Sequence, residues 1–92
     1  MSEISNIRNR IDSIDEQIAS LFSERLDITR RIAREKRAQG LPIKNEARES
    51  EVLEKVTKTV VALNPANAPA TRALYSEIFN ITCREEEEEI RE

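Results

Sequence analysis

Histidine and tryptophan are absent from this sequence of 92 residues, and cysteine occurs once, at position 83. Since there is no imidazole, catalytic triads that pair a serine or cysteine nucleophile with a histidine base are excluded. The single cysteine cannot form an intrachain disulfide, and a zinc site would lack its usual soft ligands. We therefore expect no metal site, and any catalysis must rely on arginine, lysine, carboxylates and hydroxyls.

Long apolar segments are missing as well. No apolar run approaches the roughly 20 residues that a membrane-spanning helix needs, and the N-terminus lacks the apolar core of a signal peptide. The formal net charge of −3 argues against a nucleic-acid partner unless basic groups gather on one face. These absences favour a cytoplasmic protein with neither nucleic-acid nor membrane partners.

Helix-breaking and aromatic residues are scarce: there are one glycine and three prolines, and aromatic residues make up 3%. Because 36% of the residues are charged and 38% hydrophobic, with many strong helix formers, the composition predicts an all-α fold. The length suits one domain, residues 1–92, and not two. Its core must be built from Ile, Leu, Val and Ala. A core that thin is marginal for a lone domain, and oligomerisation is a common remedy.

The first part of the chain places apolar residues at alternating steps of three and four, which is typical of a helix packed along a seam. This apolar seam consists of Ile4, Ile7, Ile11, Ile14, Ile18, Leu21, Ile28 and Ile32. The pattern continues until Gly40 and Pro42, which predict the end of the helix. A helix from about Glu3 to Gln39 would be roughly 55 Å long, whereas a compact domain of this size is only about 30 Å across. The helix must therefore protrude, and we expect a second chain to cover its seam in an intertwined homodimer.

Two further helices are expected after this stop. Asn45 is a suitable N-cap for the second helix. Segment 64–69, rich in Asn and Pro, is the only clear linker. The third helix is expected to begin at about Ala70 and to end in the acidic run 85–89. The predicted buried faces are Val52, Leu53, Val56, Val60 and Leu63 on the second helix, and Leu74, Tyr75, Ile78, Phe79, Ile81 and Thr82 on the third.

Several polar residues fall where the helical period expects apolar ones, and inward-facing charge is costly unless it is partnered. They are Arg8, Arg25 and Lys36 on the first helix, Arg48 and Glu49 on the second, and Thr82 and Glu86 on the third. The inward position of any one of these residues has an ordinary explanation: its aliphatic stem is buried while its charge reaches water, it forms a salt bridge between helices, or it lies at the boundary of the buried face. Together they predict a closed pocket for a small ligand with two negative charges, because the arginine fork can hold a carboxylate by two hydrogen bonds. The other first-helix arginines are expected to be solvated: Arg10, Arg30, Arg31, Arg34 and Arg37.

Four short segments carry a family resemblance. Residues 8–15 have the pattern R-x-x-I-D-x-I-D, residues 23–25 x-E-R, residues 33–36 A-x-x-K, and residues 42–49 P-I-x-N-x-x-R-E. Any one of them is weak, but their order and separations together resemble the all-helical chorismate mutase family. The spacings match without gaps from Ile7 to Leu53, and the third helix aligns more loosely.

The resemblance implies a homodimer of three-helix chains whose long first helices are shared across the interface. Arg8 would enter the active site of the partner chain. There it would join Arg25 of that chain in holding the two carboxylates of chorismate, with the Thr82 hydroxyl close enough to contact one of them. Glu49 would accept a hydrogen bond from the ring hydroxyl.

The implied reaction is the Claisen rearrangement of chorismate to prephenate in the shikimate pathway to phenylalanine and tyrosine, and it needs no cofactor. Lys36 and Glu86 would flank the ether oxygen of the breaking bond. Asn45 stands where aspartate is common in the family, which is tolerable if the backbone near Asn45 and Arg48 makes the substrate contact. Glu86 stands where glutamine is common. Because an ionised glutamate cannot donate a hydrogen bond, we expect Glu86 to be protonated in the active enzyme and activity to decline as the pH rises.

Two alternatives remain open at this point. An isochorismate pyruvate-lyase shares the fold and much of the pocket, although segment 42–49 favours the mutase. A non-catalytic helical dimerisation or regulatory module is the second alternative. Against it, a purely structural seam would gain stability from leucine in place of Arg25.

Overall fold

The computed structural model describes residues 2–91, and the regular structure in that range is entirely helical. Its elements are α1 (Glu3–Gln39), α2 (Glu46–Leu63), the short 3-10 turn η1 (Pro65–Asn67) and α3 (Ala68–Ile90). The predicted all-α fold with a long first helix is therefore confirmed, and the predicted bounds of that helix agree with those observed. No helix within residues 2–91 is both long enough and apolar enough to cross a bilayer.

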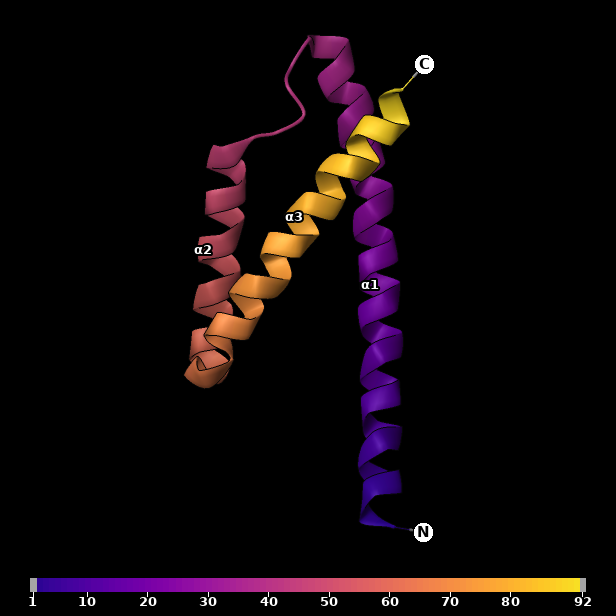
Figure 1. The fold of residues 1–92 in the computed structure, drawn as a ribbon, viewed down its shortest axis with the longest axis vertical. Helices are drawn as coiled ribbons and strands as arrows, with labels where there is room; N and C mark the ends of the chain where they lie inside the picture. The colour runs from indigo at the N-terminus through magenta and orange to yellow at the C-terminus, as the bar shows by residue number, and fades with distance from the viewer. Residues whose placement is uncertain (1, 92) are drawn as a thin grey trace.

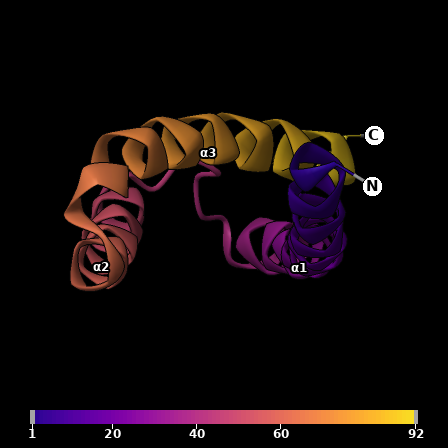
Figure 2. The same cartoon turned by 90° about the horizontal axis from the view of Figure 1, so that it is seen from below.

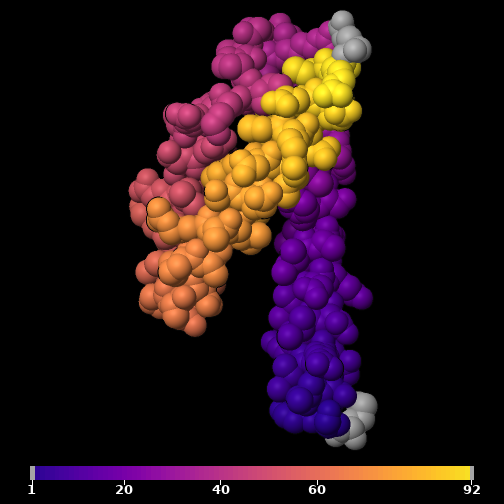
Figure 3. Space-filling view, in the orientation of Figure 1, coloured from indigo at the N-terminus to yellow at the C-terminus, as the bar shows by residue number. Residues whose placement is uncertain are grey.

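The three α-helices form an open arrangement in which α3 bridges the other two (Figures 1 and 2). α3 packs against α1 near one end and against α2 near the other, whereas α1 and α2 stand apart and are joined by the loop that follows Gly40. The chain measures 56 × 27 × 14 Å, and α1 defines the long dimension. The N-terminal half of α1 extends beyond the other two helices as a free rod (Figure 3). The predicted protrusion of the first helix is thus observed.

Both ends of α1 are capped, and the C-terminal stop at Gly40 agrees with the prediction. The Ser2 hydroxyl accepts a hydrogen bond from the backbone N–H of Ser5 at 3.1 Å. At the other end Gly40 adopts φ 69°, a left-handed conformation that L side chains rarely take up. Its N–H donates to the carbonyl of Arg37, and the N–H of Leu41 donates to that of Lys36 at 2.8 Å. The helix stops here because these two bonds satisfy its last carbonyl groups.

The junction between α2 and α3 is more regular than expected. Segment 64–69 was predicted as a linker with the third helix starting at about Ala70, yet Pro65 opens η1 and α3 begins at Ala68. Proline is compatible with the first turn of a helix, because the N–H that it lacks would have no intrahelical partner there. The Asn64 side chain accepts a hydrogen bond from the backbone N–H of Ala66 at 3.0 Å and so stabilises the turn.

The single chain has almost no hydrophobic core. Among the described residues, Ala33 and Ile78 are the buried apolar side chains. Leu63 and Leu74, which were predicted to be buried, are 82% and 57% exposed, so that prediction was wrong for the isolated chain. Every residue of the apolar seam is at least 45% exposed: Ile4, Ile7, Ile11, Ile14, Ile18, Leu21, Ile28 and Ile32. Folding of this chain alone would leave the whole apolar seam in contact with water, which is unfavourable.

Candidate active site

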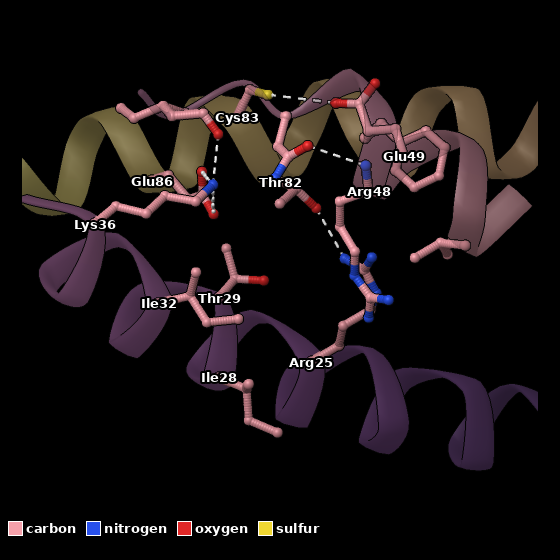
Figure 4. Close-up of a pocket in the computed structure, with 14 residues that line it drawn as sticks. Arg25, Ile28, Thr29, Ile32, Lys36, Arg48, Glu49, Thr82, Cys83 and Glu86 are labelled. Carbon is pink, nitrogen blue, oxygen red and sulfur yellow. Dashed lines mark hydrogen bonds and ion pairs between the residues drawn. The ribbon is translucent and has the colours of Figure 1, made fainter. Parts of the chain in front are cut away.

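A cavity of about 400 Å³ lies between the three helices. It is lined by every site residue predicted from the sequence except Arg8: Arg25, Lys36, Asn45, Arg48, Glu49, Thr82 and Glu86. These side chains come from α1, from the start of α2 and from the second half of α3, so the cavity exists only because α3 bridges the other two helices (Figure 4). Its size suits a small ligand.

The Lys36–Glu86 ion pair lies at one end of the cavity. The Lys36 ammonium donates to both carboxylate oxygens of Glu86, at 3.0 and 3.2 Å, and to the backbone carbonyl of Ile43. Glu86 is 3% exposed, which makes it the most deeply buried charged residue described. The ammonium group is thus held by fixed acceptors from α3 and from the loop before α2, and it faces the cavity with a defined orientation.

Arg25 lies at the opposite end of the cavity, three turns earlier on α1. One of its terminal nitrogens, Nη1, donates to the Thr82 hydroxyl at 2.8 Å. This bond fixes the guanidinium against α3, while its other N–H groups remain available to an anion. Arg25 and Lys36 therefore present two fixed positive groups at the two ends of one cavity.

The start of α2 forms the third side of the cavity. The Asn45 side chain caps this helix by accepting a hydrogen bond from the backbone N–H of Arg48 at 3.0 Å, as expected. The Arg48 side chain is exposed and forms an ion pair with Glu51 at 2.9 Å. Glu49 accepts from the Lys44 ammonium at 3.0 Å, and this hydrogen bond raises the pKa of Lys44 above its ordinary value of 10.5. The Glu49 carboxylate is therefore the hydrogen-bond acceptor on this wall of the cavity.

Cys83 lies beside Glu49 and was not predicted to be part of the site. Its Sγ lies 4.0 Å from a Glu49 carboxylate oxygen. Burial, and secondly the negative charge of Glu49, raise the pKa of the Cys83 thiol above its ordinary value of 9.0. The thiol is consequently a poor nucleophile near neutral pH, because the thiolate is the reactive form.

A row of contacts between α1 and α3 borders the Lys36–Glu86 pair. Its ion pairs are Arg30–Glu85 at 3.1 Å and Arg34–Glu89 at 2.7 Å, and Arg37 adds a hydrogen bond to the carbonyl of Ile90 at 3.1 Å. Arg34 and Arg37 are exposed, as expected, and Arg30 is half-buried, but the contacts of these three arginines with α3 were not predicted. The acidic run near the C-terminus supplies the partners of Arg30 and Arg34, since Glu85 and Glu89 lie on the side of α3 that meets α1.

Arg8 occupies the free N-terminal half of α1, is exposed, and does not line the cavity of its own chain. Its assignment to the active site of a partner chain stays a prediction.

The apolar part of the cavity wall includes Ile28 and Ile32 of the seam, which are both 46% exposed. Thr29 lines the cavity between them and had not been singled out, although its spacing of four from Arg25 could have revealed it. Within residues 2–91 no group of three or more Cys, Asp or Glu side chains is arranged to hold a metal ion.

Comparisons with known proteins place the chain in one family. The family model described as chorismate mutase type II matches residues 7–87. A curated protein of Aquifex aeolicus (strain VF5), a bifunctional chorismate mutase/prephenate dehydratase, is 40% identical over 58 residues, which cover 63% of this chain and 16% of that protein. The similarity thus spans only a small part of the length of that relative. No solved structure matches the chain.

Proposed function

The chain belongs to the chorismate mutase type II family, and we propose that it catalyses the rearrangement of chorismate to prephenate in the biosynthesis of phenylalanine and tyrosine. One observation carries the proposal: the cavity between the three helices holds a fixed guanidinium, Arg25, at one end and a fixed ammonium, Lys36, at the other. We propose the mutase activity alone, because the aligned region covers 16% of the bifunctional relative.

The substrate has two carboxylates, and we assign Arg25 to one of them. Arg25 lines the cavity and its Nη1 donates to the Thr82 hydroxyl, which holds the guanidinium in place, while its other N–H groups would bind the carboxylate. The second carboxylate needs another cation, and Arg8 of a partner chain is our candidate. Glu49 would accept a hydrogen bond from the ring hydroxyl, in exchange for part of its contact with Lys44. Asn45 and Arg48 would shape the wall beside it with their backbone.

The chemistry itself requires neither a nucleophile nor a proton transfer. The ether carbon–oxygen bond breaks while a carbon–carbon bond forms within the same molecule, so no atom enters or leaves. The protein must hold the flexible enolpyruvyl group over the ring, which is an effect of proximity and orientation. It must also place a donor where negative charge grows on the ether oxygen. The Lys36 ammonium suits this role, because Glu86 and the carbonyl of Ile43 already fix its direction.

Glu86 would be the second group at the ether oxygen. In the structure its carboxylate accepts from Lys36, and an ionised carboxylate has no hydrogen to offer an ether. We therefore propose that the active form carries a proton on Glu86, so that one oxygen accepts from Lys36 while the hydroxyl donates to the substrate. Lys36 on α1 pairs with Glu86, and the Cys83 thiol on α3 is close enough to be affected by the charge of Glu86.

We also propose that the active form is a homodimer. The seam of α1 is exposed along its whole length, and a second copy of this chain offers an identical seam. Ile28 and Ile32 belong both to this seam and to the cavity wall. A partner helix that covers the seam would therefore also close the cavity against water, and would bring its own Arg8 to the substrate.

Incubation with chorismate, with chromatographic identification of the product, tests the proposed function. Prephenate is the expected product. Consumption of isochorismate with release of pyruvate would instead identify the lyase, and no turnover of either compound would favour a non-catalytic module. The Arg25→Ala variant serves as the inactive comparison. It removes the fixed guanidinium and should lose most of the activity while keeping the three-helix fold.

A further inference from the structure

Thr29 is a cavity residue that the proposed mechanism has not used. It is 5% exposed and lines the cavity from α1. It follows Arg25 by four residues and precedes Lys36 by seven, so the three side chains lie on one face of the helix, about one and two turns apart. Figure 4 shows the Thr29 hydroxyl directed into the space between Arg25 and the Lys36–Glu86 pair.

The Thr29 hydroxyl differs from the other helical threonine hydroxyls in its hydrogen bonding. A threonine within a helix often donates to the carbonyl one turn before it. Thr57, Thr59 and Thr71 do so, with donor–acceptor distances of 2.6, 3.1 and 2.8 Å. Thr29 makes no such bond to any of the residues that the structure describes. No side-chain nitrogen or oxygen in that range is both sealed from solvent and unpartnered, so the Thr29 hydroxyl must be accessible from the cavity.

We propose that Thr29 is a further substrate-binding residue, whose hydroxyl donates a hydrogen bond to the substrate carboxylate that Arg25 holds. This inference rests on the proposed function and adds to it. Along α1, Thr29 lies closer to Arg25 than to Lys36. The Lys36 end of the cavity already holds the Lys36–Glu86 pair, so the carboxylate beside Thr29 is the one that Arg25 binds. The Thr82 hydroxyl accepts from Arg25 on the α3 side, so Thr29 supplies the matching hydroxyl on the α1 side.

Substitution of Thr29 by valine tests the inference, because valine keeps the shape of the side chain and removes only the hydroxyl. We expect Thr29→Val to raise the KM for chorismate about tenfold with little change in kcat, since a hydrogen bond to a charged group is lost in ground state and transition state alike. Thr29→Ser keeps the hydroxyl and should stay within about twofold of wild type. Thr57→Val is the matched control: Thr57 is half-buried on α2, its hydroxyl donates to Leu53, and its KM should not change.

Several results would overturn the inference. An unchanged KM in Thr29→Val, in a protein whose helical content matches wild type, would show that the hydroxyl does not bind substrate. Equal rises in KM for the Val and Ser variants would show that the residue acts by packing. If Thr29→Val does not fold, Thr29→Ala removes the same hydroxyl from a smaller side chain and is judged by the same criterion. Failure of the proposed function is distinguishable, because then the wild-type protein itself would not convert chorismate.

Discussion

Removal of the Lys36 ammonium is the most informative single change at the proposed reaction centre. Lys36→Ala deletes the donor that we assign to the ether oxygen, and it leaves Glu86 and the carbonyl of Ile43 without the ammonium that they hold. Loss of one preorganised donor of this kind typically costs about 3 kcal/mol in the transition state, or roughly a hundredfold in rate. Since the charge on the oxygen develops only during the reaction, kcat and kcat/KM should fall together.

The same change also affects stability, and this effect has to be separated from the loss of rate. Glu86 is 3% exposed and would lose its cation. Removal of one partner of a buried pair costs about 3 to 5 kcal/mol, and we take ~3 kcal/mol as an upper limit here because Lys36 itself is partly exposed. The double variant Lys36→Ala/Glu86→Gln leaves no unpaired carboxylate, so it should recover stability without recovering activity.

The assay follows the disappearance of chorismate and the formation of prephenate at saturating substrate, while thermal unfolding is measured on the same preparations. We expect a kcat about a hundredfold lower for both variants, and a lowered Tm for the single variant alone. A folded Lys36→Ala protein with a kcat within about threefold of wild type would remove Lys36 from the mechanism.

Three further outcomes are expected. Gly40→Ala should lower stability by about 1 kcal/mol, seen as a fall of roughly 4–8 °C in Tm, because L side chains rarely adopt the φ of 69° found at Gly40. An added Cβ would meet nothing within 4 Å, so this cost comes from the backbone alone, and an unchanged Tm would contradict it. Since the pKa of the Cys83 thiol is raised, the folded protein should react with iodoacetamide at pH 8 more slowly than the urea-unfolded protein, and equal rates would contradict the burial of this thiol. Activity should decline as the pH rises in the wild type and less so in Glu86→Gln, whose amide donates at every pH; identical profiles would refute the proton on Glu86.

Much of the fold could be predicted because local rules determine it. The length of α1 follows from the uninterrupted seam and from Gly40, and the start of α2 follows from Asn45 as N-cap. The junction at segment 64–69 was harder to predict, because proline both breaks a helix and suits its first turn. Local sequence does not decide between these two roles.

The site could be predicted in part because helical periodicity shows which residues share a face. Arg25 and Lys36 stand out as charges on an apolar face. Periodicity does not show how α3 crosses α1, and for this reason the pairing of Arg30 with Glu85 was not foreseen. The same limit applies to Cys83, whose position beside Glu49 depends on how α2 packs against α3. Uncharged residues such as Thr29 give no such signal, because threonine is ordinary on either face of a helix.

Complementation between two inactive variants tests the central claim most directly, namely that Arg8 of one chain and Arg25 of its partner serve one cavity. Arg8→Ala and Arg25→Ala proteins should each lose about a hundredfold in activity, because every site then lacks one carboxylate-binding cation. In a mixed dimer one site regains both arginines and the other has neither. When the two variants are refolded together, half of the dimers are mixed, so about a quarter of wild-type activity should return. If mixed dimers form, as shown by differently tagged chains, and no activity returns, then Arg8 does not act across the interface and the proposed site is wrong.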